Sequence, residues 1–185
     1  KLFNYLKHYE VIPPDFIYSN KYITTTSSSG NSVCVIFKDL PVVYQIYPNK
    51  HLYDRMKSIC ESLIPTYQTL NGHYLTHHKD FIEPLQCITY QKIEPINQFG
   101  FDYKKMKEHV KLHLEKIKVD VQKSLEVIHE HSISHGDPTI DNIGFNSDTG
   151  NYVLFDYDKS KSNCSVFDME KDQSLFEKSL QHYLL

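Results

Sequence analysis

The stretch ISHGDPTIDNIGF, residues 133–145, sets polar side chains at fixed spacings among apolar residues that favour β-structure. Asp137 follows a His-Gly step, and Asn142 comes five residues later. A second stretch, YVLFDYDKS at residues 152–160, carries Asp156 directly after a β-type run. We expect 143–145 and 152–155 to pair as a hairpin across a turn at 146–150, which places Asn142 and Asp156 at the same end of adjacent strands.

These three side chains have the chemistry that phosphoryl transfer requires. Asn142 and Asp156 offer the oxygen ligands that suit Mg²⁺. Asp137, on the loop before them, is placed to orient a hydroxyl group and accept its proton. The neighbouring His135 is expected to pack and to hydrogen-bond the loop backbone rather than bind a metal, because the ligand-type groups around it are oxygens.

The whole chain sets wider limits. Its 185 residues suit one domain or two small lobes, and 40% hydrophobic residues suffice for a core. The formal charge of −3 gives no bulk attraction to nucleic acid, and no apolar run approaches the length of a membrane span. The four cysteines are far apart, which favours a reducing compartment. We therefore expect an intracellular protein, cytoplasmic or nuclear, with a secreted effector as the alternative and with neither nucleic acid nor membrane as a partner.

The hydrophobic pattern predicts an α+β fold. A short helix is expected within 1–20, followed by strands on either side of a turn at 29–31 and a third strand at 42–47. Apolar residues at helical spacing predict a helix over 52–70, ended early or kinked by Pro65. Two strands at 73–78 and 85–93, a long helix at 103–131, the hairpin and a last helix at 166–184 complete the order. The break between Pro95 and Gly100 is the candidate boundary between two lobes.

The segment around Asp137 resembles the catalytic core of the protein-kinase-like superfamily, in a minimal, atypical form. His135-Gly136-Asp137 stands where many protein kinases carry His-Arg-Asp, and Asp156-Tyr157-Asp158 stands where Asp-Phe-Gly is expected. The resemblance implies Asp137 and Asn142 as catalytic residues, Asn142 and Asp156 as metal ligands, and ATP and Mg²⁺ as cofactors. It also implies an N-lobe at 1–94, with a five-stranded sheet and one helix. The C-lobe, at 95–185, would be reduced and mostly helical, and would hold the catalytic loop and the metal-binding hairpin.

The same resemblance implies a set of nucleotide-binding residues: Gly30, Val35, Gln45, Glu61, Gln91 and Ile93. Gly30 and Val35 fall in the nearest register to a glycine-rich loop, although a plain hairpin turn explains Ser29-Gly30-Asn31 equally well. Gln45 stands at the position of the phosphate-binding lysine, with Glu61 as its helical partner, and Lys38 or Lys50 are alternative cations. Gln91 and Ile93 lie in the segment that resembles the adenine-binding hinge.

Three functions are compatible with these residues. The first is an ATP- and Mg²⁺-dependent kinase acting on Ser or Thr of a protein. The second is a pseudokinase, a binding or regulatory module for a protein partner, which the neutral Gln45 favours. The third is a small-molecule kinase of the aminoglycoside or choline type. The His-Gly-Asp loop favours this third function, but the 29 residues after Asp156 leave little room for its extra helical subdomain.

Overall fold

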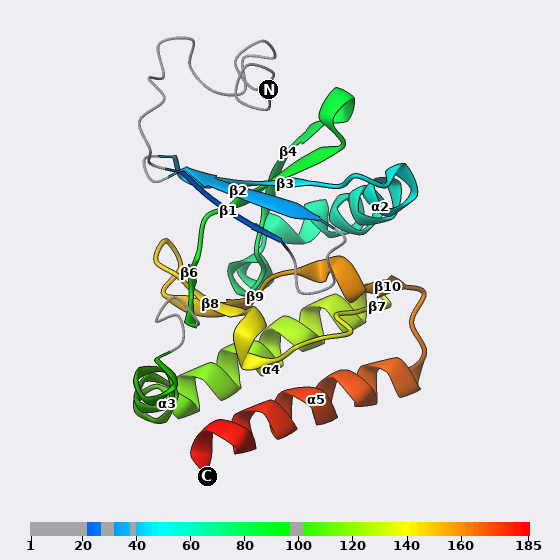
Figure 1. The fold of residues 1–185 in the computed structure, drawn as a ribbon. Coiled ribbons are helices and arrows are strands. Elements are labelled where there is room, and N and C mark those ends of the chain that lie inside the picture. Colours follow the sequence, from blue (N-terminus) through cyan, green and yellow to red (C-terminus); the bar gives the residue numbers. More distant parts are fainter. Residues whose placement is uncertain (1–21, 27–31, 38–39, 97–101) are drawn as a thin grey trace.

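The computed structural model describes residues 22–26, 32–37, 40–96 and 102–185 (Figure 1). The chain forms antiparallel sheets and, within these residues, four α-helices, so the predicted α+β class is confirmed. Helix α2 (Lys50–Tyr67) lies beside the largest sheet, whereas α4 (Leu114–Glu130) and α5 (Val166–Leu184) lie together at the opposite end of the molecule. The helix predicted within 1–20 lies outside the described residues.

The largest sheet has five antiparallel strands in the order β1-β2-β3-β5-β4. Their bounds are β1 (Tyr22–Thr26), β2 (Val33–Phe37), β3 (Val42–Ile46), β4 (His78–Ile82) and β5 (Cys87–Gln91). The strands are rich in Val, Ile and Thr, which pack well on a pleated surface. β5 is buried throughout because successive side chains face opposite sides: Ile88 and Tyr90 enter the main core, and Cys87 enters a smaller cluster with Val35 and Tyr44.

Helix α2 begins where the Asn49 side chain accepts hydrogen bonds from the first free backbone amides, those of His51 and Leu52. Met56, Ile59 and Leu63 form its buried stripe, as their spacing predicts. Pro65 lies in the last turn, and the helix ends at Tyr67, three residues before the predicted end. The sequence therefore predicts the existence and the buried face of this helix, while its end is set locally.

The prediction of a strand at 73–78 is wrong. Residues 70–74 form a 3₁₀ turn, η1 (Leu70–Tyr74), and the strand β4 begins only at His78. Gly72 lies so close to the end of α2 that a Cβ atom would come within 2.6 Å of the Thr66 carbonyl oxygen. The chain thus turns back against α2. Leu75 is fully buried in the main core and forms a single parallel bridge with Leu154 instead of joining the five-stranded sheet.

The long helix predicted at 103–131 is two helices, α3 (Tyr103–Leu112) and α4, which meet at His113. Because no proline or glycine marks this point, the sequence gives no signal for it. The cause is tertiary: α3 packs against α5, whereas α4 packs against strand β9 (Asn151–Leu154). Tyr152 of β9 lies at the bend, where its hydroxyl and the His109 Nε2 atom are 2.9 Å apart. The predicted hairpin and last helix are confirmed as β8 (Ile143–Asn146) with β9, and as α5.

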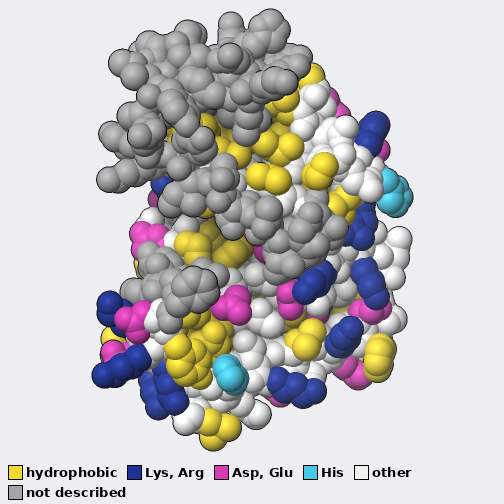
Figure 2. Space-filling view, in the orientation of Figure 1, with side chains coloured by type: hydrophobic (Ala, Val, Ile, Leu, Met, Phe, Trp, Pro, Cys, Tyr) yellow, Lys and Arg dark blue, Asp and Glu magenta, His cyan; other side chains and the backbone are white. Residues whose placement is uncertain are grey.

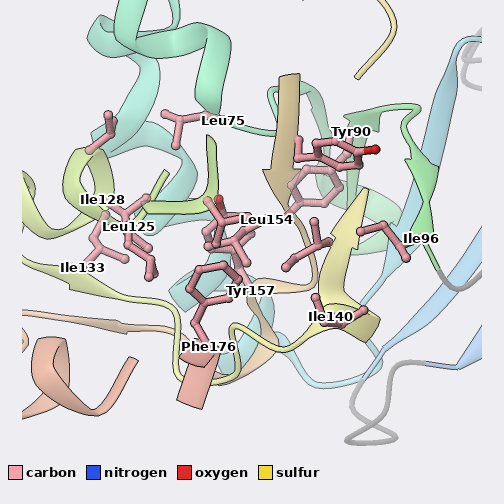
Figure 3. Close-up of a cluster of buried hydrophobic side chains, with 14 of the residues drawn as sticks. Leu75, Tyr90, Ile96, Leu125, Ile128, Ile133, Ile140, Leu154, Tyr157 and Phe176 are labelled. Atoms are coloured by element: carbon pink, nitrogen blue, oxygen red, sulfur yellow. The ribbon is translucent and has the colours of Figure 1, made fainter. Parts of the chain in front are cut away.

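The main hydrophobic core joins α2, α4 and α5 to the hairpin (Figure 3). Leu125 and Ile128 of α4 lie beside Leu154 of β9, and Phe176 of α5 lies next to Tyr157 at the edge of the cluster. The buried Asp120 carboxylate of α4 accepts the Tyr152 backbone amide at 2.9 Å. The hairpin is therefore held on α4 by both apolar packing and a buried hydrogen bond. Among the described residues, no helix combines the length and the apolar character that a membrane span needs.

We expect Leu125→Ala to lower the free energy of unfolding by about 2–5 kcal/mol, because the substitution leaves a cavity in a closely packed core. Leu125 is 1% exposed. Val119→Ala on the same helix is the matched control, because Val119 is 63% exposed and should change stability by less than about 0.5 kcal/mol. Denaturant unfolding monitored by circular dichroism measures both values, and equal losses would contradict the assigned core.

Candidate active site

The predicted site residues of the hairpin meet at one end of it. Strand β7 (Ile133–Ser134) leads into the loop that carries Asp137, and η4 (Ile140–Asn142) leads into β8. Ile143 pairs with Leu154 in the β8–β9 ladder, and beyond this pair the Phe155 amide donates to the Asn142 carbonyl at 2.9 Å. Asn142 is therefore adjacent to Asp156, as the spacing predicts.

Asn142 also joins Asp137 to the end of the hairpin. Its Nδ2 atom donates to the Asp137 carbonyl oxygen at 2.9 Å and to the Asp137 Oδ2 atom at 3.2 Å. The Asn142 side chain is buried and oriented by these two bonds, which use its amide nitrogen and leave its oxygen for another donor or a cation. The structure thus brings together the three residues of the predicted catalytic and metal-binding set, whose roles stay predictions.

Asp156 combines a strained backbone with a poorly solvated carboxylate. Its backbone lies in the left-handed region, with φ of 62°, and its Oδ1 atom is buried without a hydrogen-bond partner among the described residues. Burial, followed by the negative charges of Asp158 and Asp137, raises the pKa of Asp156 to about 6. A buried carboxylate in this state is a good ligand for a cation, because the cation would replace the missing partner.

Asp172 of α5 binds the backbone of the loop that carries Asp137. The sequence analysis did not identify this residue. Its two carboxylate oxygens accept the backbone amides of His135 at 2.7 Å and Gly136 at 2.8 Å, and His129 Nε2 lies 3.1 Å from Oδ2. Asp172 is 1% exposed. A signal was present in the sequence, because this acidic residue lies in the apolar stripe of α5, four residues before Phe176.

The loop conformation itself depends on His135 and Gly136. The His135 Nδ1 atom accepts the Asp137 amide at 3.3 Å, so Nε2 carries the proton and donates to the Phe155 carbonyl at 3.1 Å. Burial lowers the pKa of His135 to about 4, which keeps the ring neutral. Gly136 has φ of +80°, and a Cβ atom there would lie 2.5 Å from the Lys159 carbonyl oxygen. The expected packing and backbone bonding of His135 are confirmed.

Gln45 is held in a buried polar cluster that links the large sheet to the segment after β9. Its Nε2 atom donates to Ser32 Oγ at 2.8 Å and to Asp158 Oδ1 at 3.1 Å, and Ser32 Oγ donates to Asp158 Oδ2 at 2.9 Å. Asp158, which lies in η5 (Tyr157–Lys159), is 3% exposed. Sequence reasoning noted Asp158 only as part of the Asp-Tyr-Asp triplet and gave it no role.

Glu61 and Gln45 are not brought together. Glu61 is exposed on α2 and lies 3.8 Å from Lys57 on the same helix. Arg55, six residues earlier on α2, is the helix residue that reaches the site: its guanidinium donates to the Asp158 carbonyl at 2.6 Å. Arg55 is the only arginine of the sequence. A charged group from α2 therefore does contact this segment, but it is a cation and it binds the backbone.

The remaining predicted nucleotide-binding residues lie on the sheet and at the segment that leaves it. Val35 is buried in β2. The Gln91 side chain donates to Asn146 at 3.2 Å and to Asp148 at 2.8 Å, which ties the end of β5 to the β8–β9 turn. Ile93 packs so closely on β8 that a Cβ atom at Gly144 would lie 2.7 Å from its Cδ1 atom. Gly30 lies outside the described residues.

Lys159 is a further residue of the site that the sequence pattern did not predict. Its Nζ atom lies 2.7 Å from the Asp137 Oδ2 atom, and its side chain is 47% exposed. Of the two alternative cations proposed from sequence, Lys50 pairs with Asp54 at 2.8 Å on the surface and Lys38 lies outside the described residues. The ammonium group closest to the proposed base thus comes from the segment after Asp156.

The donor set fits one divalent cation shared with a phosphorylated ligand. No group of three or more His, Cys, Asp or Glu side chains that could hold a metal ion occurs in the described part of the chain. Magnesium, however, commonly takes only one or two protein ligands and completes its shell with water and phosphate oxygens. The unpartnered Oδ1 atom of Asp156 and the Asn142 amide oxygen would provide such a pair.

Comparisons of the amino-acid sequence found neither a family model nor a curated protein that matches the chain.

We expect Asp156→Asn to raise the melting temperature of the metal-free protein at pH 7.5. The folded pKa of about 6 lies above the ordinary value of 3.8, so ionisation of Asp156 costs stability as the pH rises from about 4 to 6 and above. The neutral amide removes this cost, which is on the order of 1–3 kcal/mol. At pH 4 the wild-type carboxyl group is already protonated, so the difference between the two proteins should nearly disappear.

Asp168→Asn provides a control of opposite sign. The Ser165 backbone amide, the Ser165 hydroxyl and Lys161 lower the pKa of Asp168 to about 2. Its carboxylate therefore stabilises the fold above about pH 4, and this stabilisation is lost as the pH falls through 2. Scanning calorimetry should show Asp168→Asn melting below the wild type at pH 7.5. An Asp156→Asn protein that also melts below the wild type would contradict the raised pKa of Asp156.

Proposed function

We propose that the protein is an ATP- and Mg²⁺-dependent phosphotransferase that phosphorylates Ser or Thr of a protein. The proposal includes a two-lobed, protein-kinase-like arrangement, with an N-lobe at 1–94 and a reduced C-lobe at 95–185. The observation that carries it is the meeting of Asp137, Asn142 and Asp156 at one end of the β8–β9 hairpin, with a buried Asp156 oxygen that no described residue hydrogen-bonds. The lobe assignment is supported by the five-stranded antiparallel sheet with α2 beside it, and by the helices around the hairpin.

In this proposal Asp137 is the general base. Its carboxylate accepts the proton of the acceptor hydroxyl as the new oxygen–phosphorus bond forms, and the bond between the γ-phosphorus and the bridging oxygen breaks to release ADP. The Asn142 amide fixes the Asp137 carboxylate at 3.2 Å, and Asp172 holds the backbone that carries it. Asn142 and Asp156 would hold the magnesium ion, which would neutralise charge on the phosphate oxygens.

The nucleotide would bind between the large sheet and the hairpin. The backbone of Ile93 would contact the adenine, at the point where the chain leaves the sheet and passes to β6 (Glu94–Pro95), which pairs with β8. The Gln91 and Lys92 amides already donate to the His77 and Pro41 carbonyl oxygens. Ile93 would provide an apolar contact, whereas Val35 belongs to the cluster with Tyr44 on the face of the sheet opposite to Gln45. Gln45 would reach the nucleotide only through its polar cluster with Asp158. Glu61, exposed beside Lys57, is the weakest member of the predicted set.

The test is transfer of the γ-phosphate of ATP, with Mg²⁺, to a generic protein substrate or to the protein itself. We expect Asp137→Ala to lower the rate by about 10²-fold or more, as is common for loss of a general base. Asp141→Asn in the same loop is the matched control and should keep the wild-type rate, because Asp141 is exposed. A wild-type protein no more active than Asp137→Ala would refute the proposed activity.

A second candidate is a pseudokinase that binds a partner protein, and the bonding of Gln45 favours it. Gln45 brings no positive charge and its amide is already bound to Ser32 and Asp158. Thermal unfolding with ATP and Mg²⁺ separates the cases, since binding at a hundredfold excess over Kd should stabilise by about 2.7 kcal/mol. Absence of both stabilisation and transfer would favour the pseudokinase.

A further inference from the structure

The proposed site has a deficit of positive charge. Asp137 and Asp156 belong to the proposed site, the buried Asp158 lies two residues after Asp156, and the expected lysine is the neutral Gln45. ATP adds about four negative charges, of which one magnesium ion neutralises two. Phosphoryl transfer is catalysed largely by stabilising this charge, so a further cation is needed close to the transferred group.

Two cationic side chains of the described residues reach this region. Arg55 approaches from α2, but its guanidinium is half-buried and donates to the Asp158 carbonyl, on the side of the segment that faces the helix. Lys159 approaches Asp137 itself, and its Nζ atom lies 2.7 Å from the carboxylate oxygen that also binds Asn142. Of these two cations, Lys159 is thus the one that contacts the carboxylate that would receive the acceptor proton.

The backbone of Lys159 is fixed while the end of its side chain is open to solvent. Its carbonyl oxygen packs against Gly136, where no Cβ atom would fit. The next residue, Ser160, is fully buried, and its hydroxyl donates to the His135 carbonyl at 3.1 Å. The side chain is nevertheless 47% exposed. The catalytic loop and the segment after Asp156 therefore position this ammonium group jointly.

We infer that Lys159 is a catalytic residue, which binds an oxygen of the transferred phosphoryl group while it holds the Asp137 carboxylate. An ammonium group has three donors, so one bond to Asp137 leaves two for phosphate. This inference rests on the proposed function, and it names the residue that supplies the charge missing at Gln45. Nothing in the local sequence around Asp137 points to Lys159, which lies 22 residues further along the chain.

The test compares Lys159→Met and Lys159→Arg with Lys161→Met. Lys161 is the matched control because it lies two residues away, is 65% exposed and pairs with Asp168 instead of a site residue. The measurements are kcat and KM for phosphate transfer, the melting temperature, and the dissociation constants of ATP and ADP by titration calorimetry. The ratio of the ATP and ADP dissociation constants reports contact with the terminal phosphate. This ratio would not change if Lys159 had only a structural role.

We expect Lys159→Met to lower kcat by about 10²-fold or more and to reduce the preference for ATP over ADP by about fivefold or more. Its melting temperature should equal that of the Lys161→Met protein. Lys159→Arg keeps the charge and should recover part of both losses. A Lys159→Met protein with kcat and nucleotide preference within twofold of Lys161→Met would overturn the inference. A wild type without transfer, whose ATP preference still falls in Lys159→Met, would refute the proposed activity and support Lys159 as the phosphate contact.

Discussion

The buried carboxylate of Asp172 is the interaction on which the geometry of the site depends. It accepts two consecutive loop amides, those of His135 and Gly136, which have no place in a strand or helix and would otherwise be buried without partners. A single carboxylate satisfies both only if the loop turns sharply, and the positive φ of Gly136 allows this turn. Because α5 carries Asp172 on its apolar face, packing of α5 against α4 and β7 also sets the direction of Asp137. The position of the proposed base is thus fixed by the core.

The segment from Asp156 to Ser160 is the second constraint, because each of its residues faces a different part of the molecule. Tyr157 enters the main core close to Leu154 and Phe176 (Figure 3). Asp158 binds Gln45 and Ser32 of the large sheet through its side chain, and Arg55 of α2 through its carbonyl. A movement of α2 or of β3 would therefore be transmitted to the neighbouring Asp156. The sheet, the helix and the hairpin are coupled at one short turn.

The outer surface gives little indication of this interior polarity. On the face shown in Figure 2, Lys and Arg side chains lie among Asp and Glu side chains over the part of the molecule that contains the helices. Surface pairs of this kind contribute little to stability and mark no particular ligand. The acidic residues of the proposed site are instead the buried or half-buried aspartates at 137, 156, 158 and 172. Amino-acid composition alone does not distinguish them from surface acidic residues.

The sequence could predict those features that depend on local spacing, and not those that depend on long-range contacts. The Asn142–Asp156 adjacency follows from the length of one hairpin, and the stripe of α2 follows from its period. The break at His113 and the displaced strand β4 depend on packing against Tyr152 and Gly72, which the period of the chain does not reveal. Gln45 could be predicted as a site residue from its position in the sequence, but its hydrogen bond to Asp158 joins residues that are 113 positions apart.

The distribution of charge follows from the same long-range contacts. In the pattern that the sequence resembles, a strand lysine pairs with a helix glutamate, whereas here the strand offers Gln45, the helix offers Arg55, and the carboxylate stands in the turn at Asp158. Gln45 donates to the Asp158 carboxylate and Arg55 donates to the Asp158 carbonyl oxygen, so the cluster holds the sheet and α2 to the turn after the hairpin. In the proposed function, charge neutralisation is then left to Lys159, which pairs with Asp137. Its backbone packs against Gly136, whose amide donates to the Asp172 carboxylate. The constraint that shapes the loop therefore also positions the ammonium group next to Asp137.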